Sequence, residues 1–223
     1  MKISPTLTEV KEIAKTGKYD ILPVSCEILS DFITPIEAMR ILQNVSTHCY
    51  LLESAQANEA WGRYTFLGYD PKLEINCIDG HMKLGKLSVE TENPSEYIRQ
   101  ILSEYKSPKF DYLPSFTGGL VGYFSYDYLG YKEKSIRGKA RDTEDFKDVD
   151  LMLFDKVIAF DNLCQKIILI ANMSLDAPET GYNKAIVELK QLRELLMHGE
   201  KKQNMGGKLL GEVTPLFEKE QYC

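Results

Sequence analysis

A chain of 223 residues with 43% hydrophobic and 27% charged side chains has the size and composition of a globular protein with one sizeable core or two small ones. Its 27 basic and 33 acidic side chains give a net charge of -6 without a long basic block, which argues against nucleic acid or anionic membrane as the main partner. The five scattered cysteines and three distant histidines show no metal-ligand spacing, so we predict no metal site. No signal peptide opens the chain and no apolar run could span a bilayer, so we expect a cytoplasmic protein.

The first predicted elements are a helix and a strand. Thr6 and Glu9 have the spacing of a capping box, in which each side chain accepts from the backbone N–H of the other residue, and Gly17 marks the end of the helix. An apolar strand is predicted over residues 21–28.

A second helix is predicted to begin at Thr34, whose capping partner is Glu37. Pro35 suits the first helical position because the N–H that proline lacks would have no partner there. The chain then enters an apolar strand that ends in a polar pair, Glu53 and Ser54.

The strongest hairpin signal lies within residues 73–84. Apolar and polar residues alternate on both sides of Asp79 and Gly80, a pair that accepts the positive φ angles of a tight turn. A third helix is predicted from Asn93 to the region before Pro108.

A glycine-rich segment precedes a strand that we predict to be buried over residues 120–126. A phosphate-binding loop would require a lysine, a hydroxyl and a helix after the glycines, and none of these follows here. Gly118, Gly119 and Gly122 are therefore interpreted as positions of close backbone approach or of a bulge within a sheet.

Residues 132–149 are irregular and carry charges of both signs, which indicates a helix end and a surface loop. Several carboxylates occur in and after this segment without the EF-hand spacing and its central glycine, so a solvated charged segment is favoured over a calcium site: Asp142, Glu144, Asp145, Asp148 and Asp150. A long hairpin is predicted next, with strands over residues 151–160 and 166–171.

A fourth helix is predicted over residues 178–197, with Gly199 just beyond its end. The chain then becomes polar and glycine-bearing, as linkers are. We therefore expect an α+β fold of mainly antiparallel sheets in a sandwich with about four helices, organised as one domain over 1–198 and a linker over 199–223.

The polar end of the strand before Glu53 is the main candidate site. Arg63 opens the next strand, so we expect a carboxylate, a hydroxyl from Ser54 and a guanidinium at one sheet edge. Such a corner suits an amino acid, because a carboxylate partners its ammonium and an arginine its carboxylate. The alternative is an exposed ion pair between Glu53 and Arg63 that contributes little to stability.

Three motifs resemble a known family. Leu-Leu-Glu-Ser at residues 51–54, Gly-Arg-Tyr-Thr-Phe-Leu-Gly-Tyr-Asp-Pro at 62–71 and Gly-Gly-Leu-Val-Gly-Tyr-Phe-Ser-Tyr-Asp at 118–127 occur in the order and spacing of the amino-terminal region of anthranilate synthase component I, a chorismate-utilising enzyme. Three linked motifs are far more specific than any one of them.

The resemblance implies that the full-length protein is a carbon–oxygen lyase that converts chorismate to anthranilate in tryptophan biosynthesis, with magnesium and a glutamine amidotransferase component II as partner. In such enzymes a larger chorismate-binding region carries the magnesium ligands and catalytic groups. We expect that region to be absent here, so no catalytic residue, cofactor ligand or metal ligand is nominated, and the chain alone is expected to be inactive.

The resemblance also implies that this part of the enzyme carries the feedback site for tryptophan. Five residues are expected to contact the inhibitor: Leu52, Glu53, Ser54, Pro35 and Arg63. Glu53 would face its ammonium and Ser54 its carboxylate or the pocket wall, and Pro35 and Arg63 have structural alternatives as a helix start and an ion pair. Leu51, Leu52 and the aromatic strand after Gly119 would supply the apolar part of the pocket.

Two other functions stay open at the level of the sequence. Aminodeoxychorismate synthase component I, of the folate pathway, shares the Gly-Arg-Tyr and Gly-Gly-x-x-Gly-Tyr patterns but tends to differ at the Glu-Ser ending of the first motif. A free-standing amino-acid-binding regulatory module is the alternative from another class.

Overall fold

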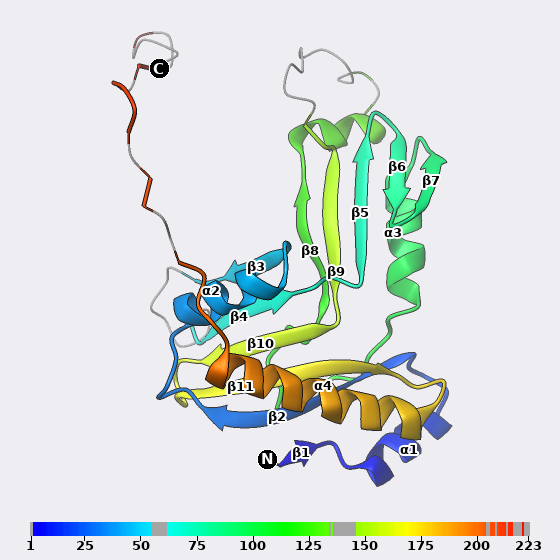
Figure 1. The fold of residues 1–223 in the computed structure, drawn as a ribbon. Coiled ribbons are helices and arrows are strands. Elements are labelled where there is room, and N and C mark those ends of the chain that lie inside the picture. Colours follow the sequence, from blue (N-terminus) through cyan, green and yellow to red (C-terminus); the bar gives the residue numbers. More distant parts are fainter. Residues whose placement is uncertain are drawn as a thin grey trace.

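The computed structural model of the chain contains two antiparallel sheets, one lying across the base of the molecule and one standing upright on it (Figure 1). The α+β class and the antiparallel sheets confirm the predicted fold class. The structure describes residues 2–54, 62–133, 135, 146–203, 206–207, 209–212, 214–215 and 220.

The first sheet has six strands in the order β1-β2-β11-β10-β4-β3. Three helices pack on one of its faces and bury the main hydrophobic core: α1 (Leu7–Lys15), α2 (Pro35–Val45) and α4 (Pro178–His198). Alternate residues of two central strands face a smaller core on the other side, which residues 110–116 cover. The strands are β1 (Ile3–Ser4), β2 (Ile21–Leu29), β3 (Cys49–Leu52), β4 (Tyr64–Tyr69), β10 (Lys156–Asp161) and β11 (Lys166–Ser174).

The second sheet has five strands in the order β7-β6-β5-β9-β8 and packs against α3 (Pro94–Ser103). Buried residues of its central strands and Ile98 of the helix form a separate core. Both sheets are therefore stabilised by helices on a single face. The strands are β5 (Leu73–Ile78), β6 (His81–Leu84), β7 (Leu87–Glu90), β8 (Gly119–Phe124) and β9 (Val149–Phe154).

Local sequence signals are confirmed where they depend on near neighbours in the chain. Thr6 and Thr34 each cap a helix with the complete capping box. The turn between β5 and β6 places Asp79 at φ 48° and Gly80 at φ 83°, the positive angles that the pair was expected to adopt. Caps and tight turns are set by a few consecutive residues, so the sequence locates them well.

The single strand predicted over residues 151–160 is wrong, because the chain changes sheets at Asp155. β9 ends at Phe154 in the second sheet and β10 begins at Lys156 in the first. The carbonyl oxygen of Asp155 accepts hydrogen bonds from the backbone N–H of Asn172 at 2.8 Å and from its side-chain amide at 3.0 Å. Hydrophobic residues lie on both sides of this point, so the pattern conceals the break.

The strand predicted to be buried over residues 120–126 is shorter than expected and lies at the edge of its sheet. β8 ends at Phe124, and a 3-10 helix, η1 (Tyr126–Tyr131), follows it. β8 pairs only with β9 and forms an edge of its sheet, which leaves Tyr123 and Phe124 exposed. An apolar run indicates a strand but does not reveal how many neighbours it has.

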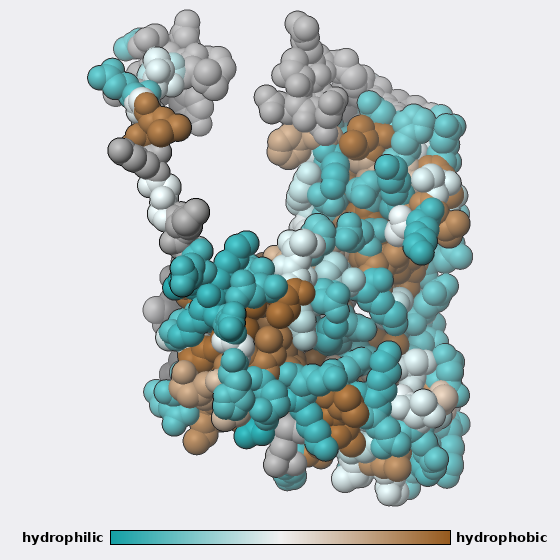
Figure 2. Space-filling model, viewed as in Figure 1, coloured by the Kyte–Doolittle hydropathy of each residue, from teal (hydrophilic) through white to brown (hydrophobic). Residues whose placement is uncertain are grey.

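Sequence patterns also missed the two short strands β1 and β7. Of the carboxylates considered for calcium, Asp142, Glu144 and Asp145 lie outside the described residues. After α4 the tail extends away from the two sheets, and hydrophobic residues near its free end stand apart from the body (Figure 2).

Candidate functional site

The predicted corner lies where β3 ends. β3 pairs with β4 so that Leu51 faces Leu67 and Leu52 faces Phe66 across the strands. Because side chains alternate along a strand, Leu51 packs against the main core, whereas Leu52 points to the opposite side and is 46% exposed. Leu51 is therefore part of the core. Contrary to the expectation, it does not line the pocket.

Leu52 forms one wall of an apolar groove of about 410 Å³. The groove lies between the edge of the first sheet, the strand β8 and the helix α3. The structure thus places Leu52 beside the strand that follows Gly119, the two elements from which an apolar pocket was expected. The other lining residues are Ile98, Leu102, Phe116, Leu120, Val121, Gly122, Phe124 and Leu151.

An aromatic cluster packs against Phe116, which lines the groove. Phe116 makes edge-to-face contacts with Phe66, at 5.6 Å between ring centroids, and with Tyr50, at 6.3 Å. Tyr50 also contacts Phe154 at 4.7 Å. The side chain of Tyr50 crosses so close to Gly68 that a Cβ there would lie 2.2 Å from the ring.

The Tyr50 hydroxyl is buried, and none of the described residues forms a hydrogen bond with it. Burial raises the pKa of this phenol, so it stays protonated. Sequence analysis missed Tyr50, Phe116, Ile98 and Leu102 as parts of this region. The only signal for Ile98 and Leu102 was their helical spacing, four positions apart, within the predicted third helix.

Glu53 and Ser54 follow Leu52 directly and are exposed, but neither is among the residues that line the groove. Arg63, the third member of the predicted corner, is bonded elsewhere. Its Nε donates to Oδ1 of Asp161 at 3.1 Å and its Nη2 to Oδ2 at 2.7 Å, so the two side chains form a bidentate pair.

This pair joins the start of β4 to the end of β10, and the Asp161 side chain has no exposed surface. Burial alone would raise the pKa of Asp161, but the hydrogen bond from Arg63 and that from the backbone N–H of Cys164 outweigh burial and hold this pKa below its usual value. The hydrogen bond to Asp161 correspondingly raises the pKa of Arg63. Arg63 therefore takes part in a structural ion pair, which was the alternative to ligand binding. Its partner is Asp161, whereas the sequence suggested Glu53.

Pro35 occupies the first position of α2, half-buried, and does not line the groove. A short connection joins the other end of α2 to β3. Of the five predicted site residues, the structure thus places only Leu52 in the groove wall. Glu53 and Ser54 are exposed directly after it, Pro35 starts α2, and Arg63 pairs with Asp161.

The described part of the chain contains no group of three or more histidine, cysteine, aspartate and glutamate side chains arranged to hold a metal ion. Its helices are all too short or too polar to cross a membrane.

An α+β chain with an apolar groove at the end of a Leu-Leu-Glu-Ser strand is consistent with the resemblance drawn from its motifs. Residues 47–223 match the family model described as chorismate binding enzyme, and the chain belongs to this family. The match includes both sides of the domain division expected at residue 199, so it does not decide where a domain ends.

Several similar proteins are named anthranilate synthase component 1. Anthranilate synthase component 1 of Acetivibrio thermocellus is 31% identical over 98% of this chain and 46% of its own length, and that of Pseudomonas aeruginosa is 36% identical over 84% and 39%. A solved structure of anthranilate synthase component I from Streptococcus pneumoniae is similar with a TM-score of 0.48 and 25% identity, over 74% of this chain and 36% of that one. The chain thus spans less than half the length of these relatives.

Proposed function

We propose that this chain is the amino-terminal part of an anthranilate synthase component I and carries its feedback element for tryptophan. Support comes from the family match and from the two relatives of that name, which favour this pathway over the folate-pathway alternative. Because those relatives are more than twice as long, we assign the lyase reaction on chorismate, its magnesium and the glutamine amidotransferase component II to the longer protein. The domain proposed over 1–198 serves regulation.

The apolar groove beside Leu52 is the observation on which the tryptophan site rests. Its volume of about 410 Å³ is within the usual range for small ligands, and its lining is almost entirely hydrophobic. An indole ring would bury apolar surface against Leu52, Phe116 and Leu120, which is favourable in proportion to the area removed from water.

In this proposal the polar half of the ligand would meet the two exposed residues that follow Leu52. Glu53 supplies a carboxylate for the α-ammonium, and Ser54 supplies a hydroxyl for the α-carboxylate. Arg63 is already engaged by Asp161, so in this proposal it positions the start of β4 behind the site and does not bind the ligand directly. Pro35 likewise fixes the start of α2.

Titrating L-tryptophan into the protein in a calorimeter tests the site. Glu53→Gln should weaken binding by about tenfold or more, because a charge-assisted hydrogen bond is replaced by a neutral one. Glu90→Gln is the matched control, since it makes the same change at an exposed position on β7 and should leave the affinity unchanged.

Ser54→Phe provides an independent measurement in the full-length enzyme. A bulky side chain two residues after Leu52 should block the groove and abolish inhibition by tryptophan while anthranilate formation continues. Equal inhibition of Ser54→Phe and the unmodified enzyme, or equal affinity of Glu53→Gln and Glu90→Gln, would refute the site.

A further inference from the structure

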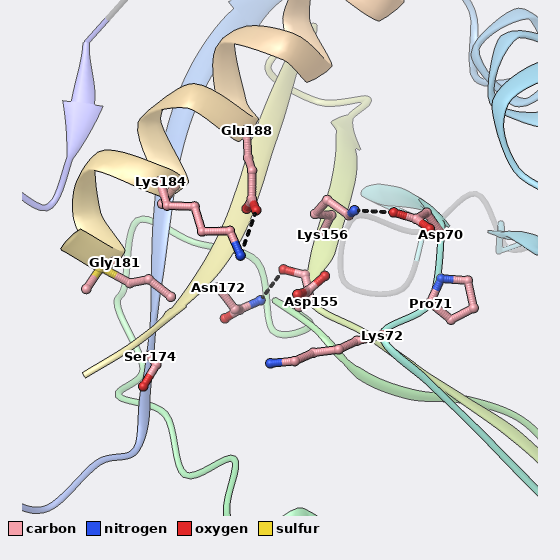
Figure 3. A pocket seen from close by; sticks show the side chains of 12 residues that line it. Asp70, Pro71, Lys72, Asp155, Lys156, Asn172, Ser174, Gly181, Lys184 and Glu188 are labelled. Carbon is pink, nitrogen blue, oxygen red and sulfur yellow. Dashed lines mark hydrogen bonds and ion pairs between the residues drawn. The ribbon is translucent and has the colours of Figure 1, made fainter. Parts of the chain in front are cut away.

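A second cavity, of about 410 Å³, lies on the first sheet away from the groove (Figure 3). Its walls come from the connection between β4 and β5, the break between β9 and β10, the end of β11 and one face of α4. Unlike the groove, it is lined mainly by polar side chains. Gly181 lets α4 approach β11 here, because a Cβ at this position would lie 2.8 Å from the carbonyl oxygen of Ser174.

Two ion pairs already neutralise part of the cavity wall. Lys156 contacts Asp70 at 2.7 Å and lies 5.1 Å from the ring centroid of Tyr69. Burial lowers the pKa of Lys156, but the hydrogen bond with Asp70 and the charges of Tyr69, Asp70 and Asp155 together outweigh burial, and the net pKa is raised. Lys184 and Glu188, one turn apart on α4, form a looser pair at 3.8 Å. These four charges balance each other.

One cation and one anion are left over. Among the described residues, neither Lys72 nor Asp155 has an ion-pair partner within 4.0 Å, although both line the cavity. The Lys72 ammonium lies 5.4 Å from the ring centroid of Tyr105, a contact that leaves its N–H donors available. The cavity wall therefore holds one cation and one anion without a close ion-pair partner, although the charge of Asp155 also acts on Lys156.

Asn172 adds an acceptor of fixed orientation next to Asp155. Its amide nitrogen donates to the carbonyl oxygens of Thr117 at 2.6 Å and Asp155 at 3.0 Å, so both N–H groups are used. Its Oδ1 accepts no hydrogen bond from the described residues and remains able to receive a donor. The half-buried Asp155 and Asn172 are thus neighbours in the cavity wall, and each offers an acceptor that suits an ammonium group.

We propose that this cavity binds a small zwitterion of the α-amino acid class, with its ammonium at Asp155 and Asn172 and its carboxylate at Lys72. A simple anion would meet the uncompensated charge of Asp155, and a simple cation would meet that of Lys72. Only a ligand with both charges satisfies both residues. The site is separate from the groove beside Leu52 and does not depend on the function proposed for it.

L-alanine is the test probe, with acetate and methylammonium as its two half-molecules. In backbone amide NMR spectra of the chain, L-alanine should cause saturable shifts at Asp155, Asn172 and Ser174, and the half-molecules should cause much smaller ones. Lys72→Met and Asp155→Asn should each reduce the affinity for L-alanine by about tenfold or more, because each removes one charge-assisted contact.

Lys86→Met is the matched control, because it removes an exposed lysine in the turn between β6 and β7 and should leave the shifts unchanged. Both cavity variants replace side chains outside the hydrophobic cores, and well-dispersed spectra would show that they fold. The proposal is overturned if L-alanine gives no saturable shift up to about 100 mM, a generous limit for so small a ligand. It is also overturned if acetate binds equally well, or if both variants bind like the control.

Discussion

Asp161 shows how a single buried charge can organise the end of a sheet. Its carboxylate has no exposed surface, and Arg63 binds it through two hydrogen bonds. The same carboxylate also accepts from the backbone N–H groups of Leu163 and Cys164, which shapes the turn between β10 and β11. Removing one member of such a pair leaves an uncompensated buried charge, which is costlier than losing the contact alone.

The pKa of Asp161 gives a pH-dependent prediction. Because its pKa is lowered in the folded state, its contribution to stability is complete above the unfolded value of about 4 and is lost as the pH falls through the lower folded value. Asp161→Asn should therefore lower the free energy of unfolding by about 1.5 to 3 kcal/mol at pH 7, because the hydrogen bonds of a charged carboxylate are replaced by those of a neutral amide.

The difference between Asp161→Asn and the unmodified chain should be constant from pH 5 to 8 and should shrink below about pH 4. Urea denaturation at each pH measures it, and taking the difference cancels the titration of other carboxylates. A difference that persists undiminished at about pH 2 would contradict the role assigned to the Arg63 pair.

At the scale of elements, β8 and β9 depend on a glycine that permits close contact. Gly122 faces Leu151 across the two strands at φ 151°, and a Cβ there would lie 2.0 Å from the carbonyl oxygen of Asp150. The clash is with backbone, which cannot move aside as a flexible side chain could. This explains why a glycine stands within a strand that also lines the proposed tryptophan groove.

Gly122→Ala should accordingly destabilise the chain by about 3 kcal/mol or more, through steric overlap and displacement of β8. Gly17→Ala is the control for backbone conformation alone, because Gly17 has φ 62° and its Cβ would meet no atom within 4 Å. That control should cost only about 1 kcal/mol. Chemical denaturation compares the two, and equal losses would show that the contact with Asp150 is unimportant.

At the scale of the whole molecule, the first residues after α4 contact α2. The carbonyl oxygen of Glu200 accepts from the side chain of Asn44 at 2.7 Å, and Lys201 pairs with Glu37. Lys202 exchanges two hydrogen bonds with Arg40, each of 3.0 Å. These contacts with α2 continue through Lys202, and the described residues beyond 203 are exposed.

Truncation tests these contacts. A chain ending at Gln203 should keep its melting temperature within about 2 °C, because the described residues beyond 203 are exposed and bury no apolar surface. A chain ending at His198 should lose about 1 to 2 kcal/mol with the contacts to α2, equivalent to a fall of several degrees for a domain of this size. Scanning calorimetry distinguishes them, and equal melting temperatures would show that residues 199–203 add nothing.

The sequence by itself determined the features that a few neighbouring residues control. The capping boxes at Thr6 and Thr34 and the turn at Asp79 are examples, because their hydrogen bonds and backbone angles involve residues no more than three positions apart. The family motifs and the alternation within the strands also identified the fold class and the position of Leu52.

Tertiary structure alone decided which distant groups meet. Arg63 pairs with Asp161, 98 residues away, instead of Glu53, and the chain changes sheets at Asp155 within a continuous hydrophobic run. Both outcomes depend on how strands pack into sheets, and the free energy of that packing is shared among residues far apart in the chain. Local patterns carry no record of those partners, so the groove and the polar cavity emerge only when the strands are assembled.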